Sequence, residues 1–562
     1  MRVIRNYCLS IGVRKSGRLP ELAGAVEDAA NFANWASTSS HGYESILITD
    51  ERTPVAIADI RNAVRKIVDD YPRRLLIFYS GHGIYSQAGD QWLLSGYDRD
   101  GSEAVNLNSS MRNARRLGIG QVAVFSDACR SSIPTAGLVD GSNIFPSPTP
   151  GRAPTAPYDE FLSTDLGQAA QEFENDGSAG YGVFTKCLLQ ALSGRDIEAL
   201  EKRGDLSVVS SETLAIRLER QVPYETGLIP NAVIQYPSIT PSWRRPDDIY
   251  VEIKESEAVA VREGISVLDG VSREPPEARQ VHQARLRVIE SKSRRAALIE
   301  DRTRVFAAAN KAEIPPGSSQ GFRIAGRRPD FLLTGYAFEH MRLLDKDEYF
   351  EHRWDEPSRT VALGFMGSHL MLLPIFPGFV ATIVTDHAGL TSLSYAPTDR
   401  WSNPKVQDVI SEWNALLTIE RGLNRLTLRE FADRMRKFKH DNPALGVLAA
   451  YAYERAGLID ELVDVAWYLA NENQFIPYDV FMLLQAYGDA HKLIRGHRSR
   501  GIGQYEVIGH FPMLTSGWSM IEEIGPNTDL ISLRPYLRNS VWTCIDFKAV
   551  DEIYGRIPSR EL

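Results

Sequence analysis

Two reactive residues follow two apolar segments of this chain. The run Leu75–Ser80 leads into a Gly-His-Gly triplet centred on His82, and the run Gln121–Ser126 leads to Cys129 three residues later. The aliphatic and aromatic composition of both runs predicts buried strands of a parallel sheet. Because the carboxyl ends of parallel strands open onto one crevice, we expect His82 and Cys129 to face the same site.

A cysteine and a histidine in one site can carry out acyl transfer. An ordinary thiol, with a pKa of about 8.5, is mostly protonated at neutral pH. A nearby imidazole can take its proton and later return it to a leaving amine. Gly83 lets the backbone approach a substrate carbonyl, so we expect the amides of Gly83 and Cys129 to hold the oxyanion. The predicted catalytic residues are therefore His82, Cys129 and Gly83.

The motifs resemble those of the caspase-like cysteine peptidases, within them the bacterial caspase-like and metacaspase branch. Four segments carry the resemblance: Tyr79–Gly83, Asp127–Arg130, Phe161–Ala170 and Gly182–Leu189. His82 and Cys129 lie 47 positions apart, close to the caspase spacing of about 50 residues. The resemblance covers roughly residues 1–245 and implies a cysteine endopeptidase of caspase fold, with a histidine oriented by a backbone carbonyl.

Acidic residues predict the substrate preference. Animal caspases, which cleave after aspartate, have glutamine two positions before the cysteine, whereas this chain has Asp127. The metacaspases that it resembles carry aspartate here and cleave after Arg or Lys. A carboxylate attracts such a side chain through a charge-assisted hydrogen bond of roughly 1.5–3 kcal/mol. Asp28, in a segment similar to the family's first-helix motif, and Glu172, near a caspase pocket arginine, are expected to join it.

A segment rich in Pro, Ser and Gly, residues 130–158, predicts an exposed loop. In the family that the chain resembles, this is the linker between the large and small subunits. Arg152 is the only basic residue between Arg130 and Lys186, so a basic-specific self-cleavage in the loop would follow it. A loop that is never cut is an equal alternative. The pair Arg294-Arg295 is a second place where self-cleavage can be sought.

The order of elements predicts an α/β fold with a mainly parallel, caspase-like sheet flanked by helices over residues 1–245. We expect its closing strand at 230–237. Residues 246–304 are predicted to form a charged helical connector, 305–402 a small β-rich domain, and 403–562 an α-helical regulatory or interaction domain.

Composition narrows the class of protein. The formal net charge of −9 does not suggest a nucleic-acid-binding surface. The four cysteines are far apart and lack disulfide or metal-ligand spacing, which favours a reducing, cytoplasmic compartment. No signal peptide is recognised at the N-terminus. The uncharged span 361–385 contains Pro374 and Pro377, so we expect buried strands there and no membrane helix.

The expected partners are protein or peptide substrates, and no cofactor or metal is expected, although calcium dependence stays open because no compact acidic loop stands out. Two alternatives remain. The domain can be a catalytically silent scaffold, although the intact His82 and Cys129 favour an enzyme. It can also be a latent bacterial zymogen that a protein partner activates through residues 250–562.

Overall fold

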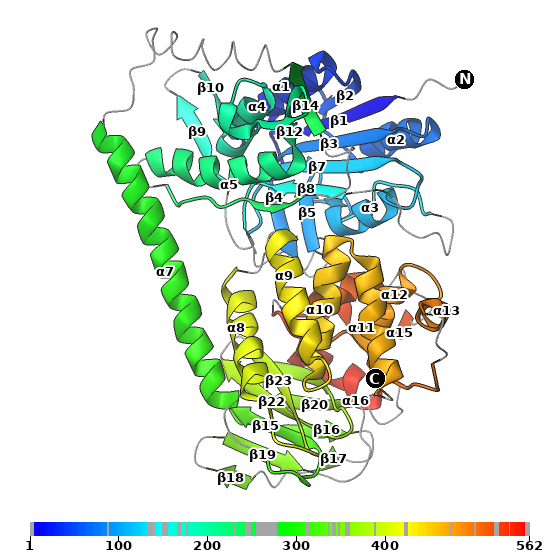
Figure 1. The fold of residues 1–562 in the computed structure, drawn as a ribbon. Coiled ribbons are helices and arrows are strands. Elements are labelled where there is room, and N and C mark those ends of the chain that lie inside the picture. The colour runs from blue at the N-terminus through cyan, green and yellow to red at the C-terminus, as the bar shows by residue number, and fades with distance from the viewer. Residues whose placement is uncertain are drawn as a thin grey trace. The chain divides into compact units, whose positions relative to one another are not determined.

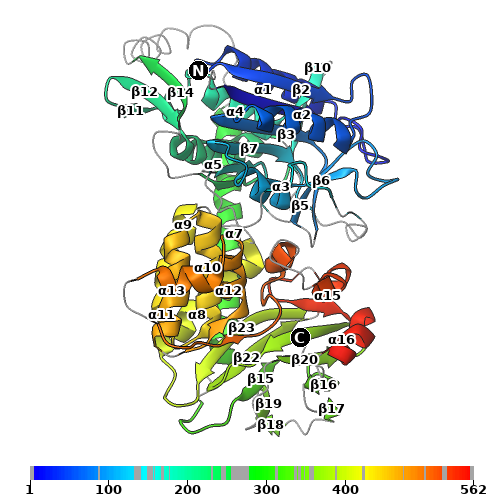
Figure 2. The same ribbon diagram turned by 90° about the vertical axis from the view of Figure 1, so that its right-hand side faces the viewer.

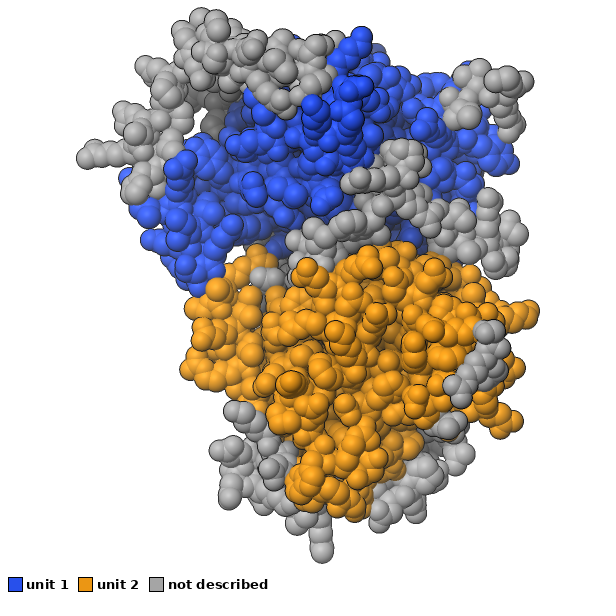
Figure 3. Space-filling view, in the orientation of Figure 1, with its two compact units in different colours: residues 1–294, 422–425 blue, residues 295–421, 426–562 orange. Residues whose placement is uncertain are grey.

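The computed structural model describes most of the chain and divides it into two compact units (Figure 3). One comprises residues 1–294 and 422–425, and the other residues 295–421 and 426–562. The described residues are 5–86, 89–131, 139, 141–148, 156, 158–165, 170–175, 178–229, 232–241, 249–254, 278–310, 314–334, 338–339, 344–346, 349–353, 360–386, 389–420, 425–472, 474–498, 502–521, 528–538 and 540–556.

A six-stranded sheet forms the centre of the first unit, with strand order β13-β8-β7-β3-β1-β2 (Figure 1). Its strands are β1 (Asn6–Gly12), β2 (Tyr43–Thr49), β3 (Arg74–Gly81), β7 (Gln121–Ala128), β8 (Tyr158–Leu162) and β13 (Ser238–Thr240). All neighbouring pairs are parallel except β13 with β8. The helices of this unit are α1 (Ala25–Thr38), α2 (Ile57–Asp69), α3 (Leu107–Ala114), α4 (Val183–Leu192) and α5 (Ser211–Leu228).

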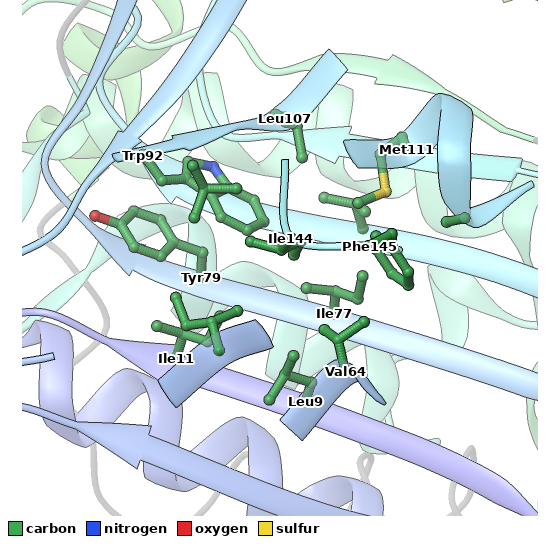
Figure 4. Packing of buried hydrophobic residues seen from close by; sticks show 14 of the residues in the cluster. Leu9, Ile11, Val64, Ile77, Tyr79, Trp92, Leu107, Met111, Ile144 and Phe145 are labelled. Carbon is green, nitrogen blue, oxygen red and sulfur yellow. The ribbon is translucent and has the colours of Figure 1, made fainter. Parts of the chain in front are cut away.

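Alternate residues of a strand point to opposite faces of the sheet. Both faces of this sheet are buried, each in its own apolar core. Leu75, Ile77 and Tyr79 of β3 belong to one apolar core, together with residues of α2 and α3 (Figure 4). Leu76 and Phe78 belong to a second core, with residues of α1, α4 and α5. Helices therefore cover both faces of a mainly parallel sheet, which confirms the predicted α/β fold (Figure 2).

Three small sheets complete the first unit. They are β4 (Gly83–Ser86) with β5 (Gly89–Leu93) and β6 (Ala104–Asn106), β9 (Glu172–Asn175) with β10 (Ser178–Gly182), and β11 (Glu201–Arg203) with β12 (Leu206–Ser210) and β14 (Ile249–Lys254). The first of these sheets begins directly after His82.

The closing strand lies later than the sequence predicts. Residues 232–237 are irregular, and the strand is Ser238–Thr240. The polar groups of Gln235 explain the difference, because its N–H donates to Thr226 Oγ1 at 3.1 Å and its side chain bonds to other loops. These bonds replace those of a strand ladder.

Two contacts join residues after position 245 to the central sheet and to α5 within the first unit. Tyr250 of β14 is fully buried, and its hydroxyl donates to Asp159 on β8. Arg287 of α7 (Ala278–Asn310) donates to the carbonyl groups of Gly227 and Ile229 at 2.9 and 2.8 Å, and to that of Ala232. The guanidinium therefore satisfies carbonyl groups at and beyond the end of α5.

The second unit contains two five-stranded sheets, with orders β18-β19-β15-β22-β23 and β17-β16-β20-β21-β26. Its strands are β15 (Gly321–Ala325), β16 (Phe331–Thr334), β17 (Phe338–Glu339), β18 (Leu344–Lys346), β19 (Tyr349–Arg353), β20 (Thr360–Phe365), β21 (His369–Pro374), β22 (Phe379–Asp386), β23 (Gly389–Pro397), β24 (Ile476–Pro477), β25 (Val507–Ile508) and β26 (Cys544–Asp546). Its further helices are α8 (Pro404–Glu420), α9 (Arg425–Met435), α10 (Pro443–Ala456), α11 (Ile459–Asn471), α12 (Tyr478–Gln485), α13 (Ala490–Gly496), α15 (Thr528–Ile531) and α16 (Val550–Arg556).

Strand β26 comes from the region predicted to be helical, yet it pairs with β21 of the predicted β-rich region. The boundary expected at 402/403 stays a prediction. The uncharged span 361–385 contributes to β20, β21 and β22. Within the described part of the chain, no helix has the length and apolar character needed to cross a membrane.

Candidate active site

His82 and Cys129 each directly follow the last paired residue of neighbouring parallel strands. Gly81 of β3 is paired with Ala128 of β7. Because paired strands lie about 4.8 Å apart, the next residue of each strand begins close to the other at the carboxyl edge of the sheet. The structure thus brings the two backbone segments together, as the spacing predicts.

Among the cysteines, Cys129 is the one that is partly exposed, whereas Cys8, Cys187 and Cys544 are buried. Burial raises the pKa of Cys8 to about 12 and also raises that of Cys187. Because the thiolate is the nucleophile, the exposed thiol of Cys129 is the best placed of the four to react.

The strand after His82 runs alongside the segment after Cys129. Ile84 forms a parallel bridge with Ser131, and the Tyr85 N–H donates to the Ser131 carbonyl at 3.2 Å. A Cβ atom on Gly83 would lie 2.6 Å from the Cys129 carbonyl oxygen. Only glycine therefore allows this approach of the two backbones.

The His82 ring has a backbone partner that the sequence motifs do not reveal. Its Nε2 lies 2.7 Å from the carbonyl oxygen of Pro20. A carbonyl can only accept, so Nε2 carries the proton and Nδ1 keeps its lone pair. Burial lowers the pKa of His82, and the Pro20 hydrogen bond acts in the opposite direction without overcoming it. The neutral ring is therefore suited to accept a proton at Nδ1.

The sulfur atom also has a backbone donor. The N–H of Ala170 donates to Cys129 Sγ at 3.3 Å. Ala170 belongs to the segment Phe161–Ala170 that resembles the family, but its type gives no signal of this contact, because any residue except proline has an N–H.

Asp28 and Asp127 converge on Gly182. Asp127 Oδ2 accepts from the Thr185 N–H at 3.0 Å and the Thr185 hydroxyl at 2.7 Å. Asp28 Oδ2 accepts from the Gly182 N–H at 3.0 Å and the Ser80 hydroxyl at 3.2 Å. A Cβ atom on Gly182 would lie 2.0 Å from Asp127 Oδ2 and 3.1 Å from Asp28 Oδ2. Both carboxyl groups are buried, and we call them the acidic pair.

The environment of Asp127 acts on its charge in two directions. Burial raises the pKa of Asp127, while the hydrogen bonds from Thr185 and Ser163 work to lower it. Its place at the amino end of α4 also favours the ionised form. The acidic pair thus already accepts hydrogen bonds from the start of α4. A bound substrate would have to interact with the same two carboxyl groups.

Glu172 lies opposite Gly182 in the pairing of β9 with β10, so its backbone is next to the acidic pair. Its side chain is not among those described, and neither is Arg152 in the loop. Arg294 and Arg295 lie within α7. A peptidase binds an extended chain, so cleavage there requires local unfolding of the helix.

A buried ion pair supports the segment after the nucleophile. Arg130 Nε and Nη2 donate to the two Asp90 oxygens at 2.6 and 2.9 Å, and Nη1 donates to the Thr164 carbonyl at 3.1 Å. Burial works to lower the pKa of Arg130, but the Asp90 carboxylate outweighs it and the pKa is raised. The pair ties β5 to the residue that follows Cys129. The sequence does not indicate this role of Asp90, because its partner Arg130 is 40 positions away.

Residues 5–243 match the family model described as the caspase domain. This part of the chain is therefore a caspase domain. No group of three or more His, Cys, Asp or Glu side chains within the described ranges is arranged to hold a metal ion.

The chain is similar to three solved structures. A protein from Geobacter sulfurreducens is 15% identical, with a TM-score of 0.30, over 45% of this chain and 98% of its own. Caspase-1 from Spodoptera frugiperda is 16% identical, with a TM-score of 0.27, over 45% and 97%. The structure of pro-sf-caspase-1 is 12% identical, with a TM-score of 0.28, over 43% and 88%. No curated protein matches the chain.

Proposed function

We propose that the caspase domain is an active cysteine endopeptidase that cleaves proteins after Arg or Lys. The observation that carries the proposal is the pairing of Gly81 with Ala128, which starts His82 and Cys129 from neighbouring positions at one sheet edge. The caspase-domain match over residues 5–243 supports the class of reaction.

In the proposed mechanism, His82 Nδ1 takes the proton of the Cys129 thiol as the sulfur attacks the scissile carbonyl. The N–H groups of Gly83 and Cys129 stabilise the oxyanion. When the carbon–nitrogen bond breaks, the protonated His82 gives its proton to the leaving amine and a thioester remains. Water, deprotonated by His82, then hydrolyses the thioester and restores the thiol. The Pro20 carbonyl stabilises the imidazolium through Nε2, which supports both proton transfers.

The preference for basic residues rests on the acidic pair. Asp127 and Asp28 place two carboxyl groups around Gly182, and Glu172 is the third acid proposed to contribute. A guanidinium or ammonium group next to ionised carboxylates gains charge-assisted hydrogen bonds. An aspartate side chain would be repelled, so caspase-type specificity is disfavoured.

The test compares fluorogenic peptides ending in Arg, Lys or Asp on the full-length protein. We expect turnover of the Arg and Lys peptides, and its loss by at least about a thousand-fold in Cys129→Ala and His82→Ala. Cys8→Ala, which changes a buried thiol, is the control that retains turnover. No turnover of any peptide, by intact protein or after limited proteolysis within 130–158, would support the scaffold alternative.

Regulation by residues 250–562, through a protein partner or through proteolytic processing, remains part of the proposal. Mass spectrometry of the purified protein distinguishes the modes. A cut after Arg152 supports processing of the loop, and a cut after Arg294 or Arg295 supports release of the second unit. An intact chain with activity dependent on an added partner supports allosteric activation.

A further inference from the structure

Gln235 is a buried residue whose side chain connects two loops of the caspase domain. Only 1% of it is exposed. Its Oε1 accepts from the Gln171 N–H at 2.9 Å, and its Nε2 donates to the Ser163 carbonyl at 2.8 Å. Its own N–H donates to Thr226 Oγ1 on α5 at 3.1 Å. The side-chain amide is thus bonded at both of its ends, and the backbone N–H of the same residue is bonded to α5.

Of the two loops that Gln235 connects, one contacts Cys129 and the other contacts the residue before it, Ala128. Gln171 directly follows Ala170, whose N–H donates to Cys129 Sγ. The Ser163 hydroxyl lies 3.1 Å from the Ala128 carbonyl and 3.2 Å from the Ala128 N–H, in the residue before the nucleophile. One side chain therefore links the loop that bonds to the sulfur with the loop that bonds to Ala128.

We propose that Gln235 is a positioning residue that holds the Ala170 N–H against the Cys129 sulfur and so favours the thiolate. An N–H donor stabilises a thiolate more than a thiol, because the charged acceptor makes the stronger hydrogen bond. Gln235 touches neither the sulfur nor the substrate site and acts through Gln171 and Ala170. The inference deepens the proposed function and rests on Cys129 being the nucleophile there.

Glutamine is the side chain that this position requires. It supplies an acceptor for one backbone and a donor for the other, at a length that reaches both. Glutamate keeps the acceptor toward Gln171, but it places an oxygen against the Ser163 carbonyl. Leucine has a similar volume and makes neither bond. Gln235→Glu therefore removes the contact with Ser163 only, and Gln235→Leu removes both contacts.

The test measures the reactivity of the Cys129 thiol and needs no peptidase activity. The full-length protein is treated with iodoacetamide across pH, and the rate of modification of Cys129 is followed by mass spectrometry of its peptide. We expect Gln235→Leu to raise the midpoint of this profile by about one pH unit, the loss of one hydrogen bond to a charged group. Gln235→Glu is expected to raise it less. Gln190→Leu, which changes an exposed glutamine, is the control and leaves the midpoint unchanged.

The three buried cysteines report whether a variant is folded. Cys8, Cys187 and Cys544 stay unmodified in a folded protein and react in an unfolded one. If Gln235→Leu unfolds, Gln235→Glu decides the matter. A folded variant with an unchanged midpoint overturns the proposal. A raised midpoint in a protein that cleaves no peptide supports the positioning role and separately contradicts the proposed peptidase function.

Discussion

Gly81 and Ala128 are paired across β3 and β7, and the same offset of 47 residues holds along the pairing from Arg74 and Gln121 onward. His82 and Cys129 lie 47 positions apart because they continue this register by one residue. Their separation in the sequence is therefore a consequence of the register of two parallel strands.

The first prediction concerns the pH dependence of catalysis. Burial lowers the pKa of His82 below its ordinary value of 6.5, and a general base must be neutral to act. The acid limb of kcat/KM on an Arg peptide is therefore expected at a midpoint below 6.5. The measurement is kcat/KM between about pH 4.5 and 9. An acid limb centred above the ordinary histidine value contradicts a neutral buried base.

Asp127→Asn tests the acidic pair while preserving shape. We expect kcat/KM for Arg peptides to fall by about ten- to a hundred-fold, the loss of one charge-assisted hydrogen bond. Peptides with an uncharged residue at the cleavage position should change little. Asp205→Asn, an exposed acid, is the matched control. Equal loss on basic and neutral peptides would assign Asp127 a structural role only. Burial raises the pKa of Asp127, so the carboxyl group takes up its proton early as the pH falls. The wild-type preference for Arg should therefore weaken on acidification, beginning at a pH higher than an ordinary aspartate would give.

Gly182→Ala tests the packing of the same carboxyl groups. The added Cβ would lie 2.0 Å from Asp127 Oδ2, so the carboxylate or the backbone must move. We expect a loss of stability of about 1–3 kcal/mol together with reduced turnover of Arg peptides. Gly496→Ala, where nothing lies within 4 Å, is the control. Thermal unfolding and peptide kinetics measure the two effects, and unchanged values in both contradict the described packing.

Asp90→Asn leaves the Arg130 guanidinium buried without its carboxylate. Removing one partner of a buried pair costs about 3–5 kcal/mol. We expect this destabilisation in the urea unfolding of the first unit, with faster hydrogen exchange in β5. The double variant Asp90→Asn/Arg130→Met should recover part of the loss, since no charge is then left buried. Additive effects of the two substitutions would show that the pair does not interact as described.

Asp479 predicts a pH dependence in the second unit. Burial raises its pKa to about 6, against hydrogen bonds from Met513, Tyr451 and Leu514 that lower it. A raised pKa means that the folded state holds the proton more tightly. The contribution of this group to the free energy of unfolding is about 3 kcal/mol at most. It is complete below about pH 4 and is lost as the pH rises through 6. Between pH 5 and 7.5, thermal unfolding should show about 1.4 kcal/mol of this loss, because the rest occurs below pH 5. Asp479→Asn should remove the difference.

Hydrophobic runs and the residues at their ends made the central sheet predictable, together with the places of His82 and Cys129 after two paired strands. Pro20, Ala170 and the backbone N–H of Gln171 were not, because they act through groups that nearly every residue shares. The sequence predicts a strand at Gln235, since a strand and an extended loop have the same local composition. Strand β26 was missed because three residues, Cys544–Asp546, carry too little periodicity and form a strand only by pairing with β21.

The contacts of Tyr250 and Arg287 bear on where the caspase domain can be cut from the rest of the chain. A polypeptide ending at residue 243 would contain the whole family match. It would lack the ring that packs against Phe125 and Phe161 at 5.6 and 6.0 Å, as well as the guanidinium that covers the end of α5. Such a fragment would expose apolar surface and aggregate more readily. A recombinant domain should therefore extend past Arg287, into the first turns of α7.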